Sequence, residues 1–224
     1  MSAPDPNGIP GRVAGIRARI EAAARRSGRD PGSVTLLAVT KTKPLEDALA
    51  AYAAGVRSFG ENRVQEAEGK LPGLPPDAVK HLIGPLQGNK VNRAVKLFDC
   101  IQTVDREELA RKLAHAAEAA SRRLPVFVEV NSGGESTKAG VPTAETAALV
   151  EAVRRLPALD LRGLMTIPPP GEGRPHFAAL RELAAKLGLP ELSMGMSDDF
   201  EEAIEEGATV VRIGSALFGV RSLG

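Results

Sequence analysis

The chain has 224 residues, with 29 Lys and Arg against 28 Asp and Glu and a net charge of +1. This balance argues against a polyanionic partner such as nucleic acid or an acidic membrane surface. Cys100 is the only cysteine, which excludes an intramolecular disulfide and a cysteine-based metal cluster and fits a reduced, cytoplasmic setting. No apolar run reaches the length of a membrane span. We expect one domain, because this length suits a single β/α barrel.

The N-terminal region divides into a tail and a helix-like segment. Residues 1–11 contain three prolines and two glycines and are predicted to be disordered. Residues 12–29 are rich in arginine and poor in acidic residues, a composition that organellar transit peptides share. Val13, Ile16 and Ile20 recur at helical spacing, however, which favours an amphipathic helix docked on the protein. We therefore expect a barrel domain over residues 12–224 that begins with this extra helix.

Short apolar runs alternate with longer helix-like segments from Val34 onward. Eight such runs predict an α/β fold with parallel strands and right-handed crossovers, closed as a (β/α)8 TIM-type barrel. A doubly wound open sheet is the alternative, but no G-x-G-x-x-G follows the first strand and no Walker sequence occurs. The expected strands are 34–40, 56–60, 79–84, 99–103, 125–131, 159–166, 190–193 and 209–213. The expected helices include 45–54, 105–122, 143–155, 174–187 and 197–206.

Lys41 follows the first buried strand directly. Pro44 then opens the next helix, because proline fits a first helical turn and cannot extend a central strand. Lys41 is therefore expected at the carboxyl ends of the strands, where ligands bind in barrels and open sheets alike. A partly desolvated lysine is a nucleophile that forms Schiff bases with carbonyl compounds. The alternative is that Lys41 and Lys43 are solvated charges that end the strand.

The loops after the last two strands suggest a phosphate site. Residues 193–197 lead into a predicted helix, and helix N-termini offer free N–H groups to anions. In residues 212–215, Gly214 lets backbone amides approach an anion closely. The alternatives are an ordinary N-cap at Ser197 and a rim ion pair between Arg212 and Glu205 or Glu206. His81 and Met165 alternate with apolar neighbours, as residues that fill a barrel interior do.

Several segments together resemble one known family, the pyridoxal 5′-phosphate (PLP) homeostasis proteins. They run in order from residue 38 to residue 219 and so cover nearly the whole chain. Two positions depart from the family pattern: Lys80 stands where an aromatic residue is frequent, and Gly88 where serine is usual. The segments are Ala38-Val39-Thr40-Lys41-Thr42-Lys43-Pro44, Phe59-Gly60-Glu61-Asn62, His81-Leu82-Ile83-Gly84-Pro85-Leu86-Gln87-Gly88-Asn89-Lys90, Gly163-Leu164-Met165, Leu192-Ser193-Met194-Gly195-Met196-Ser197-Asp198-Asp199 and Val211-Arg212-Ile213-Gly214-Ser215-Ala216-Leu217-Phe218-Gly219.

The resemblance implies a fold-type III PLP-binding barrel similar to the N-terminal domain of alanine racemase. It makes Lys41 the lysine that holds PLP as an aldimine and places Arg212 opposite the pyridine nitrogen. Asn62 and Met165 would line the cofactor. The residues that it places around the phosphate are Ser193, Gly195, Ser197, Gly214 and Ser215.

Three features favour a carrier of PLP over an enzyme. The chain ends at Gly224, soon after the eighth unit, and its only tyrosine, Tyr52, lies in a predicted helix away from the rim. An arginine at the ring nitrogen would also weaken the ring as an electron sink. We expect a monomeric, cytoplasmic PLP homeostasis protein without amino-acid turnover, without a metal, and with PLP-dependent apo-enzymes as partners. A small racemase or decarboxylase, with His81 as its base, is the first alternative, and a phosphosugar enzyme is the second.

Overall fold

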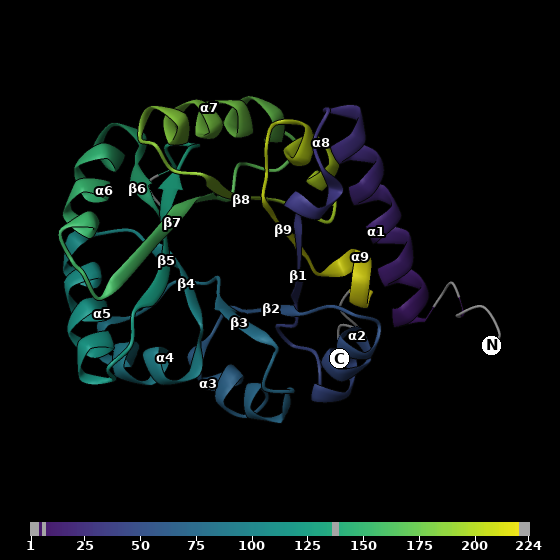
Figure 1. Ribbon diagram of the computed structural model, residues 1–224, viewed down its shortest axis with the longest axis horizontal. Coiled ribbons are helices and arrows are strands. Elements are labelled where there is room, and N and C mark those ends of the chain that lie inside the picture. Colours follow the sequence, from purple (N-terminus) through teal and green to yellow (C-terminus); the bar gives the residue numbers. More distant parts are fainter. Residues whose placement is uncertain (1–4, 6–7, 136–138, 220–224) are drawn as a thin grey trace.

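The computed structural model describes residue 5 and residues 8–135 and 139–219 (Figure 1). Strands and helices alternate along almost all of this part of the chain. The strands are β1 Thr35–Val39, β2 Ser58–Glu61, β3 Val79–Leu82, β4 Cys100–Val104, β5 Leu124–Asn131, β6 Val141–Pro142, β7 Leu159–Thr166, β8 Glu191–Met196 and β9 Val210–Ile213. The helices are α1 Ile9–Arg26, α2 Leu45–Ala53, α3 Val64–Glu68, α4 Val91–Leu97, α5 Glu107–Ala119, α6 Thr146–Arg154, α7 Gly173–Lys186, α8 Phe200–Glu205 and α9 Ser215–Phe218.

The parallel strands close into a barrel, as predicted. Their order is β4-β3-β2-β1-β9-β8-β7-β5, and a pairing between β4 and β5 joins the two ends. Figure 1 shows the ring of strands with the helices outside it. The open-sheet alternative is therefore wrong. The two-residue strand β6, which the sequence pattern did not predict, pairs with the last residues of β5.

Two predicted boundaries near the expected phosphate loops are wrong. Strand β8 continues to Met196 rather than ending at Ser193, and α8 begins at Phe200 rather than at Ser197. A turn separates them, in which the Asp199 carboxylate accepts a hydrogen bond from the Met196 N–H at 2.6 Å. Ser197 is consequently a turn residue and not the N-cap of the helix.

Helix α1 docks on the outside of the barrel, as the spacing of its apolar residues predicted. Val13, Ile16 and Ile20 are buried, and the helix contacts α2, α8 and α9. Because α9 has only four residues, α1 supplies most of the helical layer beside β9 and β1. The helix begins at Ile9, so residues 9–11 do not belong to the predicted tail, and residues 1–4 and 6–7 of that tail lie outside the described part.

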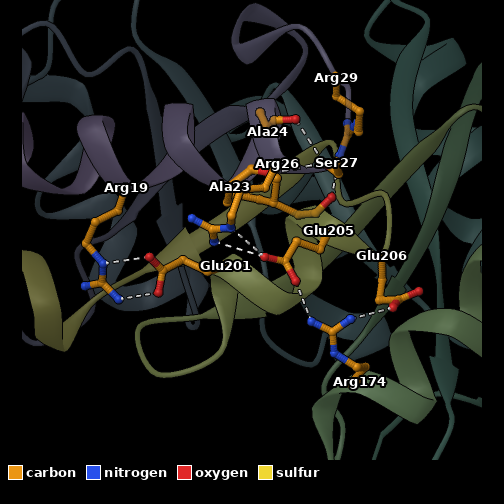
Figure 2. Close-up of polar contacts among 11 residues, drawn as sticks. Arg19, Ala23, Ala24, Arg26, Ser27, Arg29, Arg174, Glu201, Glu205 and Glu206 are labelled. Atoms are coloured by element: carbon orange, nitrogen blue, oxygen red, sulfur yellow. Dashed lines mark hydrogen bonds and ion pairs between the residues drawn. The ribbon is translucent and has the colours of Figure 1, made fainter.

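Ion pairs on the surface hold α1 against α8. Arg19 pairs with Glu201 at 2.9 Å and stacks over the Phe200 ring, and Arg26 pairs with Glu205 at 2.9 Å (Figure 2). Exposed pairs of this kind each contribute about 0–1 kcal/mol, so the apolar face of α1 provides most of the docking energy. No helix in the described residues is both long enough and apolar enough to cross a membrane.

Candidate functional site

A cavity of about 410 Å³ opens at the carboxyl ends of the strands. It brings together residues that are far apart in sequence, because parallel strands present their carboxyl ends at one face of a barrel. Sequence reasoning did not predict the apolar part of the cavity's lining, to which Ile83, Ile167 and Met196 contribute. Of the nine predicted site residues, six line the cavity: Lys41, Asn62, Ser197, Arg212, Gly214 and Ser215.

The two lysines after β1 have different surroundings. The Lys43 ammonium donates hydrogen bonds to the carbonyl oxygens of Phe218 and Gly219, at 3.1 and 3.4 Å, and so ties this loop to the end of α9. Within the described residues, Lys41 makes no hydrogen bond or ion pair. Lys41 is half-buried, so it is the lysine whose amine is available at the cavity.

A buried ion pair behind the loop positions Lys41. The Lys70 ammonium donates to Glu61 Oε1 at 2.7 Å and to the Thr40 carbonyl at 2.6 Å, and both side chains are almost fully buried. Thr40 Oγ1 donates to the same Glu61 oxygen at 2.7 Å, and burial is the main reason that the pKa of Glu61 is raised. No sequence motif indicated this pair, because its members come from different elements.

The residue after Lys41 adopts an uncommon backbone conformation. Thr42 has φ of 63°, in the left-handed region that non-glycine residues seldom occupy. Its N–H donates to the Glu66 carboxylate, which also lies 3.4 Å from the Lys70 ammonium. The Glu66 carboxylate, itself paired with Lys70, therefore holds the turn in a conformation that would otherwise be disfavoured.

Arg212 is buried at the base of the cavity, with only 3% of its surface exposed. Its guanidinium donates to Ser193 Oγ and to the Thr166 carbonyl oxygen, both at 2.8 Å. Burial lowers the pKa of Arg212 to about 10, so the side chain remains charged at neutral pH.

The alternative of a rim ion pair for Arg212 is wrong. Glu205 pairs with Arg26 and Arg174, as Figure 2 shows, and Glu206 pairs with Arg174 and Arg181. Both glutamates therefore act on the outer surface of the barrel.

Ser193 lies in the barrel interior and not among the residues that line the cavity. Its hydroxyl accepts the hydrogen bond from Arg212 and donates to Gln102 Oε1 at 2.6 Å. The Gln102 amide nitrogen lies 3.1 Å from His81 Nδ1, so it donates to that ring. Ser193 therefore follows the inward-facing register of β8 and orients Arg212, and its predicted place at the phosphate stays a prediction.

His81 and Met165 fill the interior, as their alternation with apolar residues predicted. His81 is 9% exposed, and burial lowers its pKa to about 4, so the ring is neutral at physiological pH. Met165 is fully buried against Cys100 and Phe127. Met165 is not among the residues that line the cavity, and its implied position against the cofactor stays a prediction.

Glu129 is a second interior residue that sequence reasoning missed. It is only 6% exposed, and its Oε2 atom has no hydrogen-bond partner within the described residues. Burial is the main cause that raises the pKa of Glu129 to about 7; Asp105 raises it further and Arg212 lowers it. The charge state of this carboxyl therefore changes near neutral pH.

The two predicted phosphate loops meet at Ser197. Its hydroxyl oxygen accepts hydrogen bonds from the backbone N–H groups of Gly214 and Ala216, at 3.3 and 3.2 Å. Gly195 has φ of +89°, and a Cβ on it would lie 2.5 Å from the Ala203 methyl group. Gly195 thus allows β8 to pass close to α8, but it does not itself line the cavity.

Two comparisons with known sequences show which family this chain belongs to. The family described as alanine racemase, N-terminal domain, matches residues 12–222. The pyridoxal phosphate homeostasis protein of Pseudomonas aeruginosa is 49% identical over 221 residues, which cover 95% of each protein. The chain belongs to the pyridoxal phosphate homeostasis protein family. The family resemblance that the sequence motifs carried is confirmed.

Solved structures of other proteins share this barrel fold. PipY of Synechococcus elongatus PCC7942, solved with PLP bound, aligns with a TM-score of 0.83 and 40% identity, covering 94% of this chain and all of PipY. An alanine racemase of Clostridium difficile aligns with a TM-score of 0.76 at 15% identity, covering 96% of this chain and 57% of the racemase. At that identity the racemase shows a shared fold alone.

Proposed function

We propose that this protein binds PLP covalently through Lys41 and acts in intracellular PLP homeostasis without turning over amino acids. The observation that carries the proposal is that the Lys41 amine, which has no partner among the described residues, shares one cavity with Arg212 and with the Ser197–Gly214 contact. The names of the relatives and the PLP-bound PipY structure support the same cofactor.

The residues at the cavity fit the three reactive parts of PLP. Lys41 supplies the amine for the carbonyl group. The Ser197 hydroxyl oxygen accepts from two backbone N–H groups and keeps its own proton, so it is suited to donate to a phosphate oxygen at a place where backbone amides favour an anion. Arg212 supplies only donors, so a ring nitrogen that accepts from it stays unprotonated. PLP itself supplies an aldehyde that reacts with amines and a ring that withdraws electrons.

The positions of the tyrosine and histidine side chains that could act as a catalytic base favour a carrier of PLP over an enzyme. The Tyr52 hydroxyl donates to Asp77 at 2.5 Å and does not line the cavity. His81 is neutral and buried below the mouth of the site. Among the described residues that line the cavity, none is a tyrosine or a histidine that would act as a base opposite Lys41. The proposal includes a monomer in the cytoplasm that exchanges PLP with PLP-dependent apo-enzymes.

Borohydride reduction tests the covalent link. Protein loaded with PLP is expected to show the absorbance of a lysine-bound cofactor, and reduction followed by peptide mapping is expected to place the pyridoxyl group on Lys41. Lys43→Ala is the matched control, since Lys43 is the neighbouring rim lysine and bonds to backbone carbonyls instead. Recovery of the label mainly on Lys43, Lys90 or Lys138 would overturn the assignment.

A further inference from the structure

A second pocket, of about 660 Å³, is also lined by the Lys41 turn. It is formed by the starts of α2 and α3, and it shares Lys41, Thr42, Lys43 and Asn62 with the cofactor cavity. Its volume is within the range of small-molecule sites, about 300–1,000 Å³. Lys41 therefore stands between two pockets, and the proposed cofactor uses only one of them.

The charged residues in this pocket divide into two groups. Lys43 and Glu66 are engaged, the first by the carbonyl groups at the end of α9 and the second by Lys70 and the Thr42 N–H. The side chains of Lys41, Asp47 and Arg63, by contrast, make no hydrogen bond or ion pair within the part of the chain that the structure describes. A carboxylate and a guanidinium therefore remain available to a ligand beside the lysine.

We propose that this pocket binds a free α-amino acid, with its carboxylate on Arg63 and its ammonium on Asp47. An arginine presents a planar fork of donors that matches a carboxylate, and a carboxylate accepts the hydrogen bonds of an ammonium. The lysine side chain of a protein offers the same ammonium. It lacks a carboxylate next to the amine, however, so it leaves Arg63 unused.

The role of the pocket rests on the proposed function: the bound amino acid releases PLP from Lys41. One proton of its ammonium first passes to the imine nitrogen of Lys41, which frees the lone pair of the incoming amine; the amine nitrogen then forms a double bond to the cofactor's carbonyl carbon while the double bond from that carbon to the Lys41 nitrogen breaks. The three protons of the incoming ammonium end on the Lys41 nitrogen, which leaves as an ammonium, so atoms and charge balance. A separate pocket allows this amine to approach without displacing the phosphate or Arg212.

Binding to the cofactor-free protein tests the pocket independently of PLP. Saturation-transfer NMR is expected to detect glycine on the wild-type protein, with about tenfold weaker binding to Arg63→Gln and to Asp47→Asn, since each removes a charge-assisted contact. Arg155→Gln, which removes an exposed arginine at the end of α6, is the matched control and is expected to bind as wild type does. Circular dichroism verifies that each variant is folded.

A release experiment then tests the role. With PLP-loaded protein, the rate of PLP release is expected to reach a plateau as the glycine concentration rises. With methylamine, which lacks the carboxylate, the rate should rise linearly without a plateau. Arg63→Gln should abolish the plateau with glycine and leave the rate with methylamine unchanged. A lysine-containing peptide is expected to behave as methylamine does. The pocket proposal is overturned by glycine binding that Arg63→Gln leaves unchanged, or by equal behaviour of glycine and methylamine. Protein that binds glycine but does not load PLP would instead contradict the proposed function alone.

Discussion

Arg212 donates a hydrogen bond to Ser193 Oγ at 2.8 Å. Ser193 in turn donates to Gln102, and Gln102 bonds to His81, so the four side chains form one series of hydrogen bonds. The four side chains come from β9, β8, β4 and β3, so the chain of hydrogen bonds crosses the inside of the barrel. Because Ser193 donates to the Gln102 carbonyl, the Gln102 amide must donate to His81 Nδ1, and the proton of the neutral ring lies on Nε2. Arg212 is therefore held in one orientation from below the cavity.

Ser193→Ala is expected to disturb Arg212 without touching the phosphate loops. The variant leaves the buried Gln102 carbonyl oxygen unpaired and removes one acceptor from Arg212, so the free energy of unfolding should fall by about 1–3 kcal/mol. The absorbance of bound PLP should change as well, because its ring nitrogen loses an oriented donor. Urea denaturation and visible spectra check both effects, with Ser215→Ala as the comparison that changes the phosphate loop and leaves the contacts of Arg212 in place. Unchanged spectra in Ser193→Ala would argue against a positioning role.

Glu129→Gln is expected to stabilise the protein at high pH. The pKa of Glu129 is about 7 in the folded protein against 4.5 for the ordinary group, so the folded state binds more protons than the unfolded state between these values. Stability therefore falls as pH rises from 4.5 to 7. At pH 8 the variant should gain up to about 3 kcal/mol over wild type, and at pH 4 almost nothing. Denaturation at the two pH values measures the difference, and an equal gain at both would contradict the assignment.

Ionisation of His81 should give the opposite pH dependence of the folding stability. Its pKa is about 4 when folded and 6.5 ordinarily, so the folded state binds fewer protons than the unfolded state between these values. Its contribution to stability is lost as pH falls from 6.5 to 4, by an amount on the order of 3 kcal/mol. His81→Asn should remove this dependence, so the stability difference between wild type and variant shrinks toward low pH. A constant difference across the range would show that His81 is not a buried neutral ring.

Gly195→Ala is expected to be more damaging to the fold than Gly214→Ala. At Gly195 the backbone is left-handed, and the new methyl group would meet Ala203 at 2.5 Å; at Gly214 it would meet Val39 at 3.5 Å, an ordinary contact. Gly195→Ala should therefore cost about 1–3 kcal/mol of stability. Gly214→Val should instead weaken PLP binding, and more than Ser215→Ala does, because it crowds the backbone amides. Thermal denaturation and PLP titration of the four variants separate these effects.

Holo protein is expected to restore the activity of an apo-transaminase when the two are mixed. The Lys41 turn lies at the rim between two open pockets, so the cofactor can be exchanged with other amines. Lys41→Ala should stay folded, with stability within about 0.5 kcal/mol of wild type, yet change the rate or extent of transfer. Sustained exchange of an amino acid's α-proton with solvent, abolished by both Lys41→Ala and His81→Ala, would contradict a role without turnover.

The sequence by itself determined the barrel, its docked first helix and six of the residues that line the cavity. The barrel, the helix, Lys41 and the two glycine-containing loops follow from local signals: apolar periodicity, a lysine at the end of a buried run, and glycines after two strands. The positions of Asn62 and Arg212 at the cofactor were implied only by the family resemblance. A short motif also places a residue at the end of a particular strand, and in a parallel barrel all such ends meet at one face.

Only the tertiary structure decided which way the side chains point and which partners they have. Ser193 and Met165 lie on the inward register of β8 and β7, where they serve the interior instead of the cofactor cavity. The Lys70–Glu61 pair and the burial of the Glu129 carboxyl depend on contacts between elements far apart in the chain. Burial and charge at these places are set by neighbours across the barrel, and no local pattern of residues encodes those neighbours.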